Sequence, residues 1–169
     1  VDEWAALALD PESPGGMRCD GAPHEDLVGH GPACAAIVRR LAPECRLQSV
    51  RVLGERLSGK GNVFAAGLRW AVANGADVVE FNLSCPNVTS CDGQLYQLPN
   101  DAAIVAAAVR AAAGGKPLVA KIGFFHEPRD IAPLVDALAP HITAIAATNC
   151  IATRVVGSNG HPMFDAQPR

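Results

Sequence analysis

Charged and aromatic residues are scarce in this chain, and no long apolar run interrupts it. Only 18% of its 169 residues are charged and 5% are aromatic, whereas 49% are hydrophobic. A composition this apolar and this weakly charged is typical of a folded globular chain and excludes a disordered one. No stretch reaches the roughly 18 consecutive apolar residues that a membrane-spanning helix needs, so we expect no membrane partner.

An excess of basic charge is missing as well. Lys and Arg together number 14 against 17 Asp and Glu, which gives a formal net charge of −3. Without a positive field to attract phosphates, we expect no nucleic-acid partner. The first residues, Val1-Asp2-Glu3-Trp4, contain neither Met nor a signal-peptide pattern, which indicates a processed or truncated start rather than secretion.

No CxxC pair occurs, although the chain has six cysteines. Their even number would permit a disulfide framework, but no signal peptide accompanies them. We therefore favour free thiols in a reducing compartment and predict a cytoplasmic protein. The cysteines are Cys19, Cys34, Cys45, Cys85, Cys91 and Cys150.

Regular patterning is missing from residues 1–45, where Gly and Pro are frequent and only 35–41 has a helical pattern. We predict an irregular N-terminal segment there and a second region over 46–169. In that region, strands alternate with helices, which predicts an α/β fold with parallel strands covered by helices. The predicted strands are half of the eight that a (β/α)8 TIM barrel needs, so we expect roughly its middle half. They are 47–53, 78–81, 117–122 and 142–147, and the helices lie near 63–72, 104–112 and 131–138.

Polar side chains follow the second of these strands directly, in the run Asn82-Leu83-Ser84-Cys85-Pro86-Asn87. Chemistry in parallel α/β folds collects at the carboxyl ends of the strands. A thiol there can serve as a general base once its surroundings adjust its pKa. Judged by residue type alone, Cys85 would be a buried structural cysteine, but its polar neighbours favour a catalytic role. Cys91 on the same loop has no such neighbours.

Two later strands end in the same way. Lys121 lies in an otherwise apolar strand, where its charge is costly unless it meets an anion, so we expect it to contact a negatively charged ligand. The alternative is an edge strand with Lys121 in solvent. Asn149 follows the last strand and offers donors and an acceptor to a ligand, although a turn asparagine would look the same.

Two other patterns are weaker. A near match to a phosphate loop, Gly54-Glu55-Arg56-Leu57-Ser58-Gly59-Lys60-Gly61, has Gly61 where a Ser or Thr should hold Mg²⁺, so we do not favour nucleotide hydrolysis. Four further residues could in principle gather around zinc, but their spacing matches no paired-ligand motif, and we predict no metal site. They are Cys19, His24, His30 and Cys34.

The run from Val79 to Asn87 resembles the most diagnostic motif of the dihydroorotate dehydrogenase family, whose flavin barrel dihydropyrimidine dehydrogenase shares. Ala120-Lys121-Ile122 and Ala147-Thr148-Asn149 follow in the order and at the separations typical of that family. The similarity covers residues 46–169. It implies an FMN-binding (β/α)8 barrel of the soluble class, which carries cysteine at the base position and oxidises dihydroorotate to orotate in pyrimidine biosynthesis.

The resemblance also implies roles for individual residues. Cys85 would remove the proton from substrate C5 while hydride leaves C6 for the flavin. Lys121 would lie beside the flavin, where a cation stabilises the anionic reduced ring. Asn82 would contact both flavin and substrate, and Asn87 and Asn149 would bind the orotate ring and carboxylate.

The chain departs from the family in three places. Cys150 stands where Thr or Ser is usual, and residues 1–45 lack a recognisable early lysine and asparagine. The glycine-rich strand ends that hold the flavin phosphate would lie beyond Arg169. Two alternatives therefore remain, a related flavin barrel acting on another dihydropyrimidine or cyclic amide, and a non-catalytic fragment. Besides the substrate, the candidate partners are further copies of the chain and an electron-transfer protein.

Overall fold

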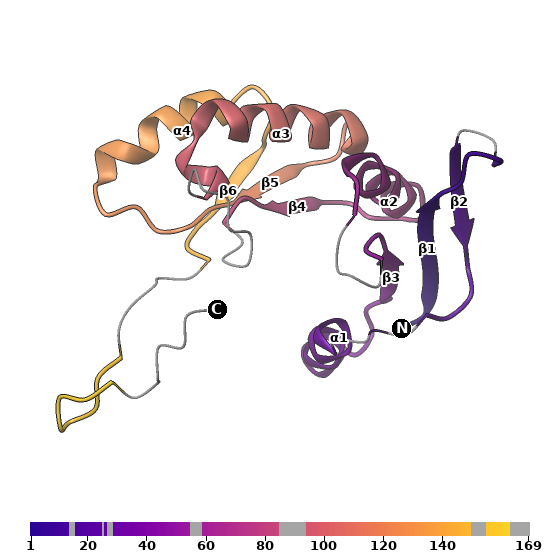
Figure 1. Cartoon of the computed structure of the whole chain (residues 1–169), viewed down its shortest axis with the longest axis horizontal. Helices are drawn as coiled ribbons and strands as arrows, with labels where there is room; N and C mark the ends of the chain where they lie inside the picture. Colours follow the sequence, from indigo (N-terminus) through magenta and orange to yellow (C-terminus); the bar gives the residue numbers. More distant parts are fainter. Residues whose placement is uncertain are drawn as a thin grey trace. The chain divides into compact units, whose positions relative to one another are not determined.

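The computed structural model describes residues 1–13, 16–24, 26, 29–54, 59–84, 94–149 and 155–162. Clustering of contacts divides the chain into two compact units, Val1–Val79 with Ala107–Pro117 and Glu80–Ala106 with Leu118–Arg169. Each unit has a three-stranded sheet (Figure 1). The elements in chain order are β1 (Glu3–Leu9), β2 (Met17–Asp20), α1 (His30–Leu41), β3 (Gln48–Arg51), α2 (Gly61–Ala73), β4 (Val79–Asn82), η2 (Leu95–Gln97), α3 (Pro99–Ala113), β5 (Leu118–Lys121), η3 (Pro128–Asp130), α4 (Ile131–Leu138) and β6 (Ala144–Ala146).

The sheet of the first unit has the order β2-β1-β3. β1 pairs antiparallel with β2 and parallel with β3. Helix α2 packs against β1 and β3. A Cβ at Gly67 would lie 2.5 Å from Cγ1 of Val52 and 3.4 Å from Cγ1 of Val50, so only glycine lets the helix come this near.

The prediction of an irregular segment over 1–45 misses two strands and the first five residues of α1, whose remaining residues match the helical pattern predicted over 35–41. β1 reads EWAALAL, and alanine has a low strand propensity, so the local sequence carries little strand signal. The segment forms a strand because it pairs with β2 and with β3, which lies about forty residues further along the sequence. The prediction that 47–53 is a strand is confirmed for β3, but this strand joins β1 in the first sheet and not the strands that follow it.

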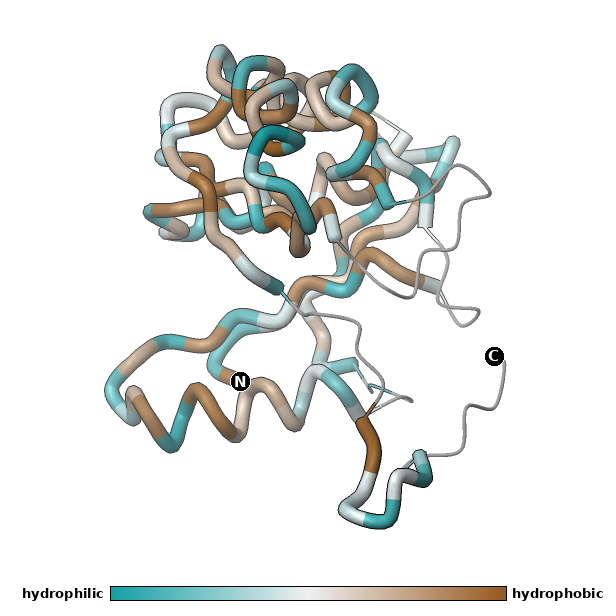
Figure 2. Tube along the Cα trace, turned by 90° about the vertical axis from the view of Figure 1, so that its left-hand side faces the viewer, coloured by the Kyte–Doolittle hydropathy of each residue, from teal (hydrophilic) through white to brown (hydrophobic). Residues whose placement is uncertain are grey.

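Helix α1 exposes an apolar side. Ile37, Val38 and Leu41 are 61%, 41% and 79% exposed, and no residue of α1 is buried. In Figure 2 the helix beside the N-terminus carries hydrophobic residues toward its C-terminal end, next to hydrophilic ones. Arg39, near the C-terminal end of α1, forms an ion pair with Asp2, which lies just before β1. Its guanidinium is 2.7 Å from the carboxylate.

The second unit contains the sheet β4-β5-β6. β5 and β6 are parallel, with Lys121 opposite Ala146. The helices α3 and α4 lie along the same side of this sheet (Figure 1). Their apolar residues meet the strands in a core that comprises Leu83, Tyr96, Ala102, Ala106, Ala120, Ile122, Leu134 and Leu138.

The helices and strands predicted after residue 60 are confirmed, with ends shifted by a few residues. Gly75 and Gly114, which follow α2 and α3, adopt positive φ angles of 104° and 60°. Such angles are typical of glycine at the C-terminal end of a helix. Across the described ranges, none of the helices is both long and apolar enough to cross a membrane.

Candidate active site

The carboxyl ends of β4, β5 and β6 lie side by side at one edge of the second sheet. The backbone N–H of Leu83 donates to the carbonyl of Lys121 at 2.9 Å. Beyond β5, the N–H of Ile122 donates to Ala146 at 2.9 Å, and the N–H of Asn149 donates to Ile122 at 3.0 Å. These hydrogen bonds hold the segments that follow the three strands in fixed register, so their polar residues share one edge.

A hydrogen-bonded chain links two of the predicted site residues across this edge. Oδ1 of Asn82 accepts hydrogen bonds from the N–H and the hydroxyl of Ser84, both at 2.9 Å. The carbonyl of Ser84 in turn accepts from Nδ2 of Asn149 at 3.1 Å. Ser84 is only 1% exposed and satisfies its hydroxyl through Asn82. The structure therefore brings Asn82 and Asn149 together through a serine that was predicted only as a neighbour of Cys85.

These hydrogen bonds fix the orientation of both side-chain amides. A backbone N–H can donate only to the oxygen of Asn82, and a carbonyl can accept only from the nitrogen of Asn149. Within the described part of the chain, Nδ2 of Asn82 and Oδ1 of Asn149 have no hydrogen-bond partner. Asn82 is exposed and Asn149 is half-buried, so the pair offers a ligand one amide donor group and one carbonyl acceptor.

Lys121 lies on the face of β5 that points away from the core. Burial alternates along β5, with Leu118 and Ala120 fully buried and Lys121 35% exposed. β5 is the central strand of its sheet and not an edge strand, yet the side chain of Lys121 is only partly buried. The ammonium of Lys121 lies 3.6 Å from the carboxylate of Glu80, whose side chain is 51% exposed. A pair this exposed contributes roughly 0–1 kcal/mol, so Lys121 remains available to another anion.

Two other predicted site residues, Cys85 and Asn87, lie outside the described residues, as does the middle of the near-match phosphate loop over 54–61. Within the described ranges, no three His, Cys, Asp or Glu side chains gather as metal ligands. The residues predicted from the sequence that the structure does place are Asn82, Lys121 and Asn149.

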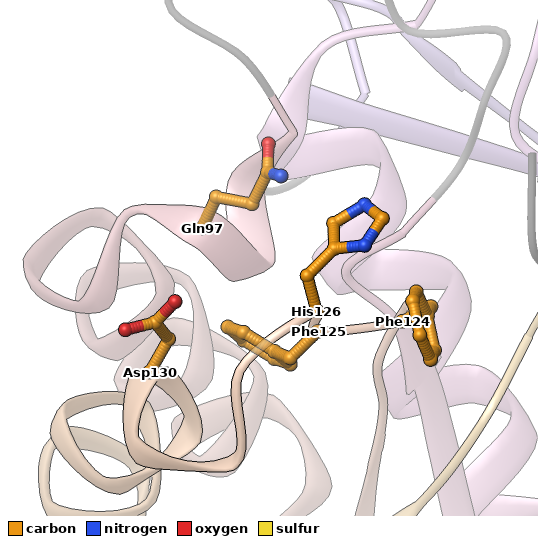
Figure 3. A pocket seen from close by; sticks show the side chains of 5 residues that line it. All are labelled: Gln97, Phe124, Phe125, His126 and Asp130. Carbon is orange, nitrogen blue, oxygen red and sulfur yellow. The ribbon is translucent and has the colours of Figure 1, made fainter.

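A pocket of about 280 Å³ lies beside the loop that leaves β5. Its walls are the rings of Phe124 and Phe125, the imidazole of His126, the amide of Gln97 and the carboxylate of Asp130 (Figure 3). The imidazole meets the ring of Phe124 edge to face, with centroids 5.1 Å apart. None of the predicted site residues lines it, although three consecutive rings two residues after a strand were a visible signal in the sequence.

No family model matches the chain, and no curated protein matches it. The case for a function therefore rests on the motif after β4 and on the geometry of the strand edge.

Proposed function

We propose that this chain carries the catalytic edge of an FMN-dependent oxidoreductase that oxidises dihydroorotate to orotate, built on part of a (β/α)8 barrel. The proposal is supported by a parallel sheet whose helices cover one face and whose polar residues gather at the carboxyl edge. The observation that carries it is the link from Asn82 through Ser84 to Asn149, because it leaves Nδ2 of Asn82 as a donor and Oδ1 of Asn149 as an acceptor without a partner among the described residues.

The donor and the acceptor complement one edge of a dihydropyrimidine ring. In such a ring, an N–H group lies next to a carbonyl group. Nδ2 of Asn82 can donate to the carbonyl, while Oδ1 of Asn149 accepts from the N–H. A site built to pair both groups rejects a ring that lacks one of them, since its own polar atoms are then left unpaired.

The residues present also suit a flavin. Lys121 supplies a cation at the carboxyl end of β5, and among the described residues its ammonium is engaged by a weak ion pair with Glu80. When bound, FMN would accept a hydride from the substrate, as flavins do in general. Lys121 would then stabilise the negative charge that develops during the reaction. The phosphate of the cofactor is not assigned to any residue of the chain.

The proton that leaves the substrate needs a base, and the motif assigns this role to Cys85. A thiolate is a sufficiently strong base near neutral pH once its pKa is tuned by its surroundings. Asn87 would complete the contacts to the substrate from the same loop. Both assignments rest on the resemblance of the run from Val79 to Asn87.

The decisive experiment measures orotate formation from dihydroorotate, with FMN supplied in excess. Replacing Cys85 by Ala should lower the rate by about 10²–10⁴, which is the usual contribution of a general base. Replacing Cys91 by Ala is the matched control, because that cysteine follows six residues later in the sequence and has no predicted role. Wild-type protein that binds FMN but forms no orotate would refute the function, and an unchanged rate in the Cys85→Ala variant would refute the role of the base.

A further inference from the structure

The first turns of α1 bring a histidine and a cysteine together. His30 and Cys34 are four residues apart on the helix, a spacing that places their side chains on the same face. Sγ of Cys34 lies 3.7 Å from Nε2 of His30. Both side chains are exposed, and Cys34 forms no disulfide, so the pair is accessible from solvent.

The separation of the two atoms fits two ligands of one tetrahedral metal ion. Zinc binds sulfur at about 2.3 Å and histidine nitrogen at about 2.0–2.1 Å, and a tetrahedral angle between these bonds separates the ligand atoms by about 3.6 Å. The observed 3.7 Å agrees with that value. The two ligand atoms are therefore already separated as in a tetrahedral site, on successive turns of one helix.

The nitrogen of His30 and the sulfur of Cys34 favour some metal ions over others. Imidazole nitrogen and thiolate sulfur together suit zinc and similar borderline or soft metals, whereas Mg²⁺ and Ca²⁺ require oxygen ligands. The nearby carboxylate of Asp26 is already engaged at the start of the helix, where it accepts from the N–H groups of Gly29 and Gly31. Water would complete the coordination.

We propose that His30 and Cys34 form a two-ligand site for a zinc-class divalent ion on the surface of the first unit. A zinc site that combines all four of Cys19, His24, His30 and Cys34 does not form among the described residues. His24 Nε2 lies 2.9 Å from the hydroxyl of Ser49 instead, and Cys19 is exposed on β2. The pair on α1 is what remains of that set, and it is independent of the proposed oxidoreductase site.

Zinc titration followed by NMR tests the pair directly. The Cβ signal of Cys34 and the imidazole signals of His30 should shift together and reach saturation at one common midpoint. Two protein ligands are half of a structural zinc site, so a dissociation constant of about 10⁻⁵ M is expected. A shift of Cys34 with unchanged His30 signals would overturn the proposal, because a thiol alone would then explain binding.

Three variants complete the test. His30→Gln and Cys34→Ser should each weaken zinc binding by at least about tenfold, since each removes one of two ligands. Cys19→Ser is the matched control, because Cys19 is another exposed free thiol and has no histidine partner within the described ranges. Equal zinc affinity in all three variants would overturn the proposal. Half an ion per chain would support it if both ligands are still required, with a second chain in place of water.

Discussion

Replacing Gly123 by Ala should destabilise the core of the second unit, close to the carboxyl end of β5. Gly123 follows β5 after one residue and is buried. A Cβ at this position would lie 2.5 Å from Cζ, 2.6 Å from Cε1 and 2.7 Å from the hydroxyl of Tyr96. Tyr96 is 7% exposed, and its hydroxyl donates to the carbonyl of Phe124 at 3.1 Å. The ring also meets Phe125 edge to face at 5.2 Å, so it has little room to retreat.

The expected cost has two parts. Forcing a methyl group into a packed core costs about 1–3 kcal/mol. If the ring of Tyr96 turns away, its hydrogen bond to Phe124 is lost as well, at about 0.5–1.5 kcal/mol. The free energy of unfolding should therefore fall by about 3 kcal/mol, which lowers Tm by roughly 6–12 °C for a chain of this length.

Urea denaturation measures this change, and NMR of Tyr96 locates it, because the chain has a single tyrosine. Gly115→Ala is the matched control, since nothing lies within 4 Å of a Cβ there. That variant should be neutral or gain up to about 1 kcal/mol from the lower entropy of the unfolded chain. In a Tyr96→Leu background, Gly123→Ala should cost much less. Equal stability of the Gly123→Ala and Gly115→Ala variants would refute the packing argument.

Two further predictions concern the first unit. Gly67→Ala should lower the free energy of unfolding by about 1–3 kcal/mol, because its Cβ would lie 2.5 Å from a methyl of Val52, and urea denaturation against wild type checks this. Burial, followed by the charge of Arg51, lowers the pKa of His24 below its usual 6.5. As the pH falls below about 6.5, the unfolded chain gains a proton at His24 that the folded chain resists, so stability should fall. Urea midpoints at pH 7.5 and 5.5 should differ less in a His24→Gln variant, and an unchanged difference would contradict this reasoning.

The elements of the second region could be predicted because their signals are local. Helix α4 was predicted with its observed bounds, since its apolar residues recur at helical spacing between a proline-containing turn and the next strand. Strand β5 has four residues, and the run that predicted it, 117–122, is apolar except for Lys121 and lies between Lys116 and Gly123. Signals of this kind do not depend on which strand lies beside which, so the elements were predicted more reliably than their pairing.

The first sheet could not be predicted for the opposite reason. β1 pairs with β3 across more than forty residues, with Glu3 opposite Gln48. Neither strand alternates cleanly, because only Ala5 of β1 is buried and β3 has no buried residue. Strand propensity depends strongly on packing against neighbours, and those neighbours are not visible in a local window. The division into two sheets follows from this non-local pairing.

The candidate site could be predicted in part. That Asn82 and Asn149 would meet follows from parallel strands, because the carboxyl ends of such strands share an edge. Which atoms they would present does not follow, because an amide can turn either way. Ser84 decides it, since its N–H and hydroxyl hold the oxygen of Asn82 while its carbonyl holds the nitrogen of Asn149. One buried serine thus turns two adaptable amides into a fixed donor on Asn82 and a fixed acceptor on Asn149.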